Sequence, residues 1–324
     1  MNKLTTVIKA TIVAAGVLSA GYAAAEWPDR PIRLVVPFPA GGSYDTVARM
    51  LSLKLEKKLG QAITVENISG GATVPGVMSV LKSKADGYTL MVTSDGSLNI
   101  NPHTIKNLPY KPDTELTPIT ILNTVPHWIV ARSDRKESSL TDLVSYIKSN
   151  PGKASISINA VGGAAHLGLA NWKQQNHLDF TIIPYRGSPP AILDLIGGQT
   201  DAHVDVIGSS VSYVTAGKVK PLATLQTAPV AQFPKLETQK AGDKNALLIR
   251  VSLALVVKTG TPQPIIDRLY KEVKSSVEEP DFLARLQTLS YEPVLSKPAE
   301  ARAFLHAETA RYGAIAKLVN IEAN

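Results

Sequence analysis

The sequence predicts an α/β fold in two domains, each built from a sheet flanked by helices. Strand-like and helix-like segments alternate along almost the whole chain, which favours parallel sheets covered by helices on both faces. Two long extended runs, 119–131 and 247–257, are spaced as if the chain crosses between two domains and returns. The chain from Glu26 to Asn324 is long enough for two domains of ordinary size, and the first would then hold both ends.

The first half of the chain supplies the first alternating elements. Ile32–Val36 is an apolar run typical of a buried strand, and Ser43 begins a helical pattern of apolar residues at 47, 51, 55 and 59. Ser139, with an acid three residues on, predicts a capped helix to about Ser149. The other expected elements are strands at 63–67 and 90–93, a helix at 74–83, a polar connection at 102–118 and the extended run 119–131.

The second half repeats this pattern. Expected strands cover 155–159, 180–184, 202–207 and 219–225. Expected helices follow the turn at 161–164 and begin near 189, 262, 281 and 296. At the second of these helices Ser188 would be the cap and Pro189 the first helical residue.

The first 25 residues are typical of a cleaved secretory signal peptide. Lys3 and Lys9 give a positive start, 11–21 is apolar but short, and Ala23–Ala25 fits a cleavage site before Glu26. The apolar run is shorter than a membrane span needs, so an uncleaved anchor is the less favoured alternative. No later segment is long and apolar enough to cross a membrane, so we expect a periplasmic protein that does not insert into the membrane directly.

Composition excludes several kinds of chemistry. The chain has no cysteine, which rules out disulfides, thiol catalysis, cysteine metal sites and a lipid-modified cysteine. The net charge is +7, and removal of Lys3 and Lys9 leaves +5. The basic residues are scattered without interleaved aromatics, so nucleic acid is not an expected partner.

The segment 31–45 predicts an anion site. A buried strand is followed by Gly41-Gly42 and then by a helix from Ser43, so free backbone N–H groups and the positive end of the helix dipole face one point. Such a point binds a carboxylate or a phosphate. Three further Gly- and Ser-rich junctions follow expected strands, at 94–97, 161–164 and 186–188, where open α/β sheets bind ligands.

Enzyme motifs are missing from the sequence. There is no Gly-x-Ser-x-Gly elbow, no phosphate loop of the Gly-x-x-x-x-Gly-Lys-Ser/Thr type, and no His-x-x-x-His pair for a metal. His166 could reach a ligand or bond to backbone at a helix start. Asp45 and Asp205 could act as acids or bases, or orient loop amides and cap helices. Arg186 could pair with a ligand carboxylate or remain solvated. No cofactor or metal is expected.

At these residues the chain resembles the Bug, or TctC-like, solute-binding proteins of tripartite tricarboxylate transporters. The opening motif resembles Trp27-Pro-Asp-Arg-Pro-Ile-Arg33 followed by Val36-Pro-Phe-Pro-Ala-Gly-Gly42 and Asp45. Further matches run along essentially the whole mature chain: Leu59-Gly-Gln61, Val65-Glu-Asn67, Ala85-Asp-Gly-Tyr-Thr-Leu90, Asn101-Pro102, Leu108-Pro-Tyr110, Asn150-Pro-Gly152, Pro184-Tyr185, Gly197-Gly-Gln199, Ala216-Gly-Lys218 and Gly260-Thr-Pro262.

The resemblance implies a two-domain periplasmic binding protein of type II-like α/β fold, with two sheets flanked by helices and a hinged interdomain cleft. The expected division is a signal peptide at 1–25, domain 1 at 26–127 plus 246–324, and domain 2 at 128–245. Ligands in the family are mostly small carboxylates, one carboxylate being held by backbone groups and ordered waters near the first strand–helix turn.

Carried onto this chain, the resemblance gives the ligand-binding residues of both domains. They are Phe38, Pro39, Ala40, Gly41, Gly42, Asp45, Ser94, Asp95, Gly96 and Ser97 in domain 1, and Asn159, Val161, Gly162, Gly163, Ala164, His166, Arg186, Gly187, Ser188 and Asp205 in domain 2. The chain departs from the family pattern at 159–164, 206–208 and 250–252, where ligand specificity would be set.

The resulting interpretation is a periplasmic receptor that captures a small carboxylate and delivers it to membrane transporter subunits, with no catalytic step. An aromatic dicarboxylate such as terephthalate is a candidate ligand, with Arg186 or Arg250 meeting the second carboxylate. One alternative is a sensory module that binds the same ligand and signals to a receptor. Another is a periplasmic hydrolase that uses Ser43 or Ser188 with His166.

Overall fold

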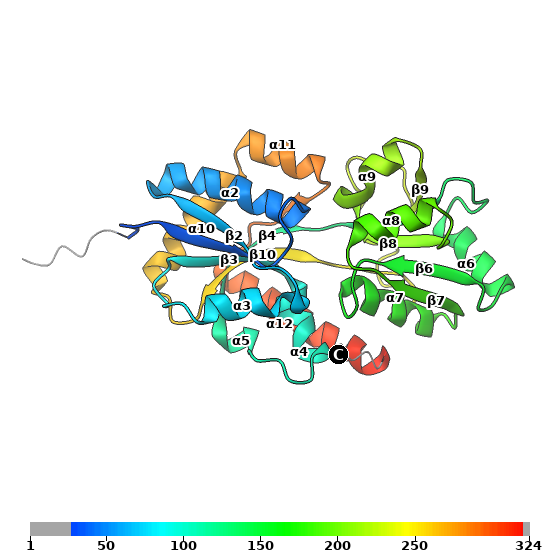
Figure 1. Ribbon diagram of the computed structural model, residues 1–324, viewed down its shortest axis with the longest axis horizontal. Coiled ribbons are helices and arrows are strands. Elements are labelled where there is room, and N and C mark those ends of the chain that lie inside the picture. Colours follow the sequence, from blue (N-terminus) through cyan, green and yellow to red (C-terminus); the bar gives the residue numbers. More distant parts are fainter. Residues whose placement is uncertain (1–26, 320–324) are drawn as a thin grey trace, which may run out of the picture.

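The computed structural model describes residues 27–319 as two lobes side by side, each with a central sheet (Figure 1). The expected signal peptide lies outside the described residues. We call the lobe that contains the strand Ile32–Val36 the first lobe and the other the second lobe. The α/β architecture of two helix-flanked sheets is therefore as predicted, and the domain boundaries remain a prediction.

The first lobe has a six-stranded mixed sheet in the order β11-β4-β10-β3-β1-β2. Its strands are β1 (Ile32–Val36), β2 (Ile63–Asn67), β3 (Thr89–Ser94), β4 (Leu116–Thr124), β10 (Ser252–Lys258) and β11 (Glu292–Pro293). β1 pairs in parallel with β2 and β3, whereas β10 is antiparallel to both β3 and β4. The sheet is mixed, not parallel as expected, because β10 enters it from the second lobe.

Helices cover both faces of this sheet. They are α2 (Ser43–Leu59), α3 (Val74–Leu81), α4 (Asn101–Thr104), α5 (Pro112–Glu115), α10 (Gln263–Val277), α11 (Pro280–Thr288) and α12 (Pro298–Val319). Leu34 and Val36 pack in the same cluster as Leu51 of α2 and Leu269 of α10, whereas Val35 packs in the cluster that contains α3. Alternate residues of β1 thus enter opposite layers, which explains the continuous apolar run in the sequence.

The second lobe has a five-stranded mixed sheet in the order β7-β6-β8-β5-β9. Its strands are β5 (His127–Arg132), β6 (Ala154–Ile158), β7 (Phe180–Pro184), β8 (Ala202–Val206) and β9 (Val219–Thr224). Its helices are α6 (Leu140–Ser149), α7 (Ala164–Gln175), α8 (Ser188–Ile196) and α9 (Ile207–Thr215). The helix α9 was not predicted, because its apolar residues follow the strand without a break.

The lobes are joined where the extended run 119–131 divides. Its first part is β4 of the first sheet and its second part is β5 of the second sheet, with Val125 and Pro126 between them. The returning segment lies beside this crossing, because the Val125 N–H donates to the Val251 carbonyl at 2.8 Å. We call these two adjacent crossings the hinge.

Two helix starts differ in how they are capped. The Ser139 side chain accepts a hydrogen bond from the Asp142 N–H, which confirms the predicted cap of α6. Ser188, however, is the first helical residue of α8, and Gly187 is its N-cap without a side-chain hydrogen bond. The predicted cap at Ser188 is therefore wrong, because the hydroxyl of Ser188 donates to Asp205 instead.

Candidate functional site

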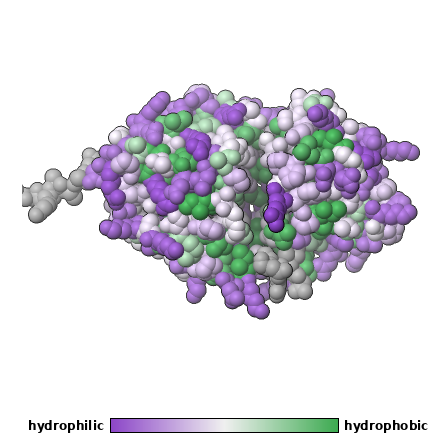
Figure 2. All heavy atoms as spheres, viewed as in Figure 1, coloured by the Kyte–Doolittle hydropathy of each residue, from purple (hydrophilic) through white to green (hydrophobic). Residues whose placement is uncertain are grey.

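The predicted binding loops follow strand ends on both lobes and meet along the space between them (Figure 1). Figure 2 shows this space as a furrow between the two halves of the molecule. The loops lead from β1 into α2, from β3 into the π-helical turn η2 (Gly96–Ile100), and from β6, β7 and β8 into α7, α8 and α9. Because strand ends carry the loops of both sheets into the furrow, we take it as the candidate ligand cleft.

The first of these loops leaves the start of α2 open. Gly41 has a φ of 79°, a left-handed conformation that glycine adopts without strain, and the N-cap Gly42 makes no side-chain hydrogen bond. The first N–H groups of a helix have no partner within it, so those of Ser43 and Tyr44 are not satisfied by α2. Pro39, Ala40, Gly41 and Gly42 are exposed beside them.

Asp45 holds this loop in place. It is only 2% exposed, and its carboxylate accepts the Gly41 N–H at 2.8 Å, Arg49 Nε at 2.8 Å and Asn67 Nδ2 at 2.9 Å. Burial opposes ionisation, but these hydrogen bonds outweigh it and lower the pKa of Asp45. The sequence left Asp45 as an acid or base, or as a residue that orients loop amides or caps a helix. Its contacts fit the orientation of loop amides.

Two aromatic rings line the same loop. Phe38 and Tyr44 are both partly buried, and their ring centroids lie 4.5 Å apart in an edge-to-face arrangement. Burial raises the pKa of Tyr44, and the negative charges of Asp95 and Asp205 raise it further. Tyr44 thus stays a neutral phenol.

The polar side chains of the loop after β3 form hydrogen bonds within the first lobe. Asp95 is 1% exposed and accepts hydrogen bonds from the Ser252 N–H, the Ser252 hydroxyl and Asn99 Nδ2. Burial raises the pKa of Asp95 to about 6, against the lowering effect of those hydrogen bonds. Ser97 is fully buried and bonds to Thr93 and Thr73. Ser94 is buried and Gly96 is partly exposed, so most side chains of this loop contact the interior of the first lobe.

In the second lobe the loop before α7 is closed by His166. The Gly162 N–H donates to His166 Nδ1 at 3.0 Å, and burial lowers the pKa of His166, so the ring is neutral and can accept this bond. The Asn159 carbonyl accepts the Gly187 N–H at 2.9 Å, which joins two predicted loops. Val161 is exposed, and Gly163 and Ala164 are partly buried at the start of α7.

A buried carboxylate lies where α8 begins. Asp205 is fully buried, and one of its oxygens accepts the hydroxyl proton of Ser188. Its other oxygen has no hydrogen-bond partner among the described residues and lies 3.8 Å from His203 Nε2. Arg186 is exposed one residue before Gly187, whose φ is 101°. An exposed cation thus stands at the cleft edge, outside the buried carboxylate.

The serines and histidine of the hydrolase alternative are not connected. His166 Nδ1 is engaged by a backbone N–H, and the Ser188 hydroxyl is directed at Asp205. No hydrogen bond between residues 27 and 319 joins His166 to Ser43 or Ser188, so the base and nucleophile of that mechanism are not paired. Within the same residues no cluster of histidine, aspartate and glutamate is arranged to hold a metal.

Sequence reasoning missed three features of the cleft. Tyr44 is the second residue of the predicted helix after the first binding loop but was not selected, and Tyr291 follows α11 in an irregular segment that carries no motif. The turn η1 (Gly71–Thr73) follows β2 and includes Ala72 and Thr73 at φ values of 50° and 73°. This turn could have been predicted, because Gly70-Gly71 follows an expected strand in the same way as the glycine junctions of the other loops.

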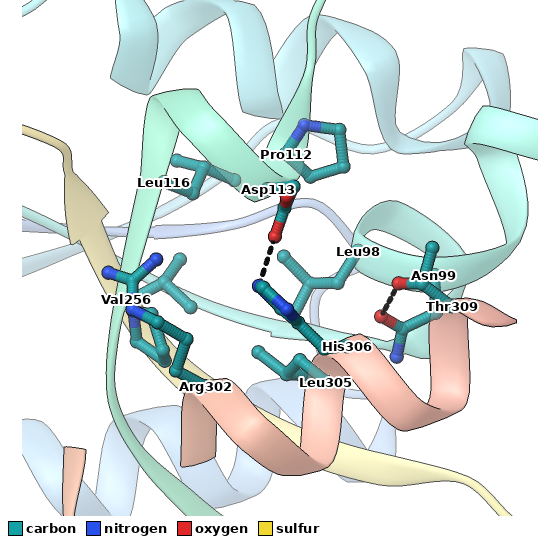
Figure 3. Close-up of a pocket in the computed structure, with 11 residues that line it drawn as sticks. Leu98, Asn99, Pro112, Asp113, Leu116, Val256, Arg302, Leu305, His306 and Thr309 are labelled. Atoms are coloured by element: carbon teal, nitrogen blue, oxygen red, sulfur yellow. Dashed lines mark hydrogen bonds and ion pairs between the residues drawn. The ribbon is translucent and has the colours of Figure 1, made fainter. Parts of the chain in front are cut away.

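A small cavity lies elsewhere in the first lobe (Figure 3). It has a volume of about 20 Å³ between α12, α5 and η2, beside the His306–Asp113 ion pair and the Asn99–Thr309 hydrogen bond. None of the predicted ligand-binding residues lines it, and it has room for about one water molecule. We therefore do not assign the ligand to this cavity.

Comparison with known proteins identifies relatives along the whole chain. Residues 47–321 match the family described as "Tripartite tricarboxylate transporter family receptor". The chain is 33% identical over 297 residues to a UPF0065 protein of Bordetella pertussis, covering 91% of both chains. It is 30% identical over 318 residues to Protein BugT of the same organism, covering 98% of this chain and 97% of the relative.

Solved structures agree with these relatives. The periplasmic binding protein BugD superposes with a TM-score of 0.80 at 29% identity, covering 92% of this chain and all of BugD. Rpa4515 of R. palustris with adipate gives 0.83 at 27% identity, covering 92% and 99% of the two chains. MatC of Rhodopseudomonas palustris with bound malate gives 0.78 at 27% identity, covering 89% and 99%. No helix within residues 27–319 has the length and apolar character needed to span a membrane.

Proposed function

Because the chain belongs to the family of tripartite tricarboxylate transporter receptors, whose members are periplasmic solute-binding proteins and not enzymes, we propose that it captures a small carboxylate in the cleft between its lobes. The bound ligand would be delivered to the membrane subunits of a tripartite transporter. The domain boundaries and the ligand-binding residues given from the sequence belong to this proposal.

One observation carries the proposal: helices from both lobes begin at the cleft without side-chain caps. The N-caps of α2, α7 and α8 are Gly42, Gly163 and Gly187, and none of them makes a side-chain hydrogen bond. α2 and α7 therefore present backbone N–H groups that have no partner within the helix, whereas Pro189 and Pro190 leave the first turn of α8 only the Ser188 N–H. All three helices present the positive ends of their dipoles. A carboxylate satisfies such groups without a charged side chain beside it.

The relatives with ligands support a carboxylate of modest size. Rpa4515 carries adipate and MatC carries malate, both of which are dicarboxylates. For this chain we retain an aromatic dicarboxylate such as terephthalate as a candidate. The exposed guanidinium of Arg186 would meet the second carboxylate, and the rings of Phe38 and Tyr44 would contact the ring of the ligand.

A thermal-shift screen tests this proposal. The panel consists of succinate, malate, adipate, citrate, benzoate, terephthalate and glutamate, added to purified protein shown by mass spectrometry to be free of ligand. An acid at a hundredfold its dissociation constant should add about 2.7 kcal/mol to the free energy of unfolding. A clear shift that calorimetric titration confirms supports the proposal. Folded protein that shifts with no member of the panel contradicts it.

A further inference from the structure

Tyr291 lies at the meeting point of the two lobes. It follows α11 and precedes β11, which pairs with Asn123 and Thr124 of β4 next to the hinge. The preceding residues touch the second lobe: Ser290 Oγ donates to Gln232 Oε1 at 2.8 Å, and Gln232 Nε2 donates to the Gln287 carbonyl at 2.6 Å. The segment from 287 to 293 therefore connects the hinge, the first lobe and the second lobe.

The hydroxyl of Tyr291 is buried without a partner. The residue is 3% exposed, and none of the residues from 27 to 319 meets hydrogen-bond geometry with its Oη. Burial raises the pKa of Tyr291, hydrogen bonding with the Ser43 side chain at the start of α2 lowers it, and the negative charge of Asp205 raises it. The hydroxyl is thus neutral and can donate its proton to a group at the start of α2, where Ser43 lies.

We propose that the Tyr291 hydroxyl is a ligand-binding group, which donates a hydrogen bond to the same carboxylate that the start of α2 receives. This inference rests on the proposed function and adds a residue to its site. The negative charge of Asp205 repels a carboxylate, so the anionic group of the ligand belongs on the α2 side of the cleft. There Tyr291 supplies a donor that carries no charge of its own.

A purely structural role does not account for this hydroxyl. Phenylalanine would fill the same space, and a buried polar atom without a partner costs free energy that a ring without it avoids. Tyr270 of α10 offers the contrast, because its hydroxyl donates to the Leu295 carbonyl at 3.3 Å within the first lobe. The Tyr270 hydroxyl thus has a structural acceptor. The Tyr291 hydroxyl interacts with the Ser43 side chain but has, among residues 27–319, no partner that meets hydrogen-bond geometry.

Tyr291→Phe separates the two roles, with Tyr270→Phe as the matched control. Wild type and both variants are titrated calorimetrically with the acid of the seven-member panel that binds wild type most tightly, and each is melted without ligand. In Tyr291→Phe we expect the dissociation constant to rise between tenfold and a hundredfold, the range for a lost hydrogen bond to a charged group. Its melting temperature without ligand should be unchanged or higher. Tyr270→Phe should melt slightly lower and bind as wild type does.

The outcomes distinguish the two proposals. If wild type binds an acid and Tyr291→Phe binds it equally well, the role of Tyr291 is overturned and the receptor function stands. If Tyr291→Phe loses stability together with affinity, the hydroxyl is structural and the inference is again overturned. If wild type binds none of the acids, the receptor function fails and the inference fails with it.

Discussion

A single carboxylate, that of Asp45, holds the predicted binding loop of the first lobe in place. It connects the Gly41 N–H to Arg49 and Asn67, so its effect on a ligand passes through the backbone. His166 does the same for Gly162 in the second lobe. In both loops a side chain from the following helix, buried in Asp45 and partly buried in His166, fixes the direction of a glycine N–H.

Asp45→Ala should weaken carboxylate binding by about tenfold without unfolding the protein. The variant frees the Gly41 N–H and loosens the loop, and lost hydrogen bonds of this kind cost about 1–3 kcal/mol. Titration calorimetry measures the affinity and circular dichroism the fold. Asp267→Ala is the control, because Asp267 is exposed on α10 and bonds to Gln263 of the same helix. Equal affinity in wild type and Asp45→Ala would remove Asp45 from the binding machinery.

At this scale the sequence predicted which turns link strands to helices better than it predicted what the side chains in them contact. The glycine junctions identified loops that follow strand ends beside the candidate cleft, and their contact with a ligand stays a prediction. Whether Asp45 or Ser188 faces the ligand depends on partners such as Asn67 and Asp205, which are 22 and 17 residues away. Tyr291 could not have been found, because its position depends on the pairing of β11 with β4.

Among the elements, β3 and β10 are joined by Asp95. This acid follows β3 and accepts both hydrogen bonds of Ser252, the first residue of β10 after the hinge. The sequence predicted both strands from their apolar residues. It did not predict the π-helical turn η2 after β3, since that turn depends on a buried polar network, in which Asn101 Nδ2 donates to the Ala72 carbonyl at 2.7 Å.

The raised pKa of Asp95 predicts a pH dependence of stability opposite to that of an ordinary ion-paired carboxylate. The folded protein binds this proton below about pH 6, whereas the unfolded chain binds it only below about pH 4. The stabilisation is therefore complete below pH 4 and is lost as the pH rises through 6, amounting to about 3 kcal/mol.

Asp95→Asn isolates this contribution from those of other carboxylates. The unfolding free energy of the variant minus that of wild type should rise by up to about 3 kcal/mol as the pH increases from 4 to 7. Urea unfolding at a series of pH values measures the difference, with the exposed Asp267→Asn as control. A difference between Asp95→Asn and wild type that stays constant over this range would show that Asp95 does not titrate there.

Across the whole molecule, one close contact between the lobes lies where Gly208 of α9 meets Leu289, just after α11. A Cβ atom at Gly208 would lie 2.8 Å from the Leu289 carbonyl oxygen, so only glycine fits this approach. On the opposite side, Tyr312 and Ala316 of α12 pack with Leu167 of α7. Both contacts depend on how the two lobes are placed relative to each other, and no local sequence pattern predicts that placement. The sequence did predict the two crossings between the lobes, as long extended runs.

Gly208→Ala should push the lobes apart and weaken ligand binding by about tenfold, since the added carbon meets backbone that cannot rotate away. Small-angle scattering should show a larger radius of gyration. Gly197→Ala serves as the control, because a Cβ there meets the Leu193 carbonyl oxygen at 3.4 Å within its own lobe. Unchanged scattering and affinity in Gly208→Ala would mean that this contact does not limit closure.

The position of β10 has a consequence for how the chain acquires its structure. β10 lies between β3 and β4 in the first sheet, yet it follows the whole of the second sheet in the sequence. During synthesis the strands from 127 to 224 can pair with one another before Ser252 emerges. β4 cannot join the first sheet until β10, which lies between β4 and β3, has been made. Contacts between distant segments form slowly. The second lobe should therefore fold first, and the apolar edges of β3 and β4 stay open to aggregation or to chaperones until β10 arrives.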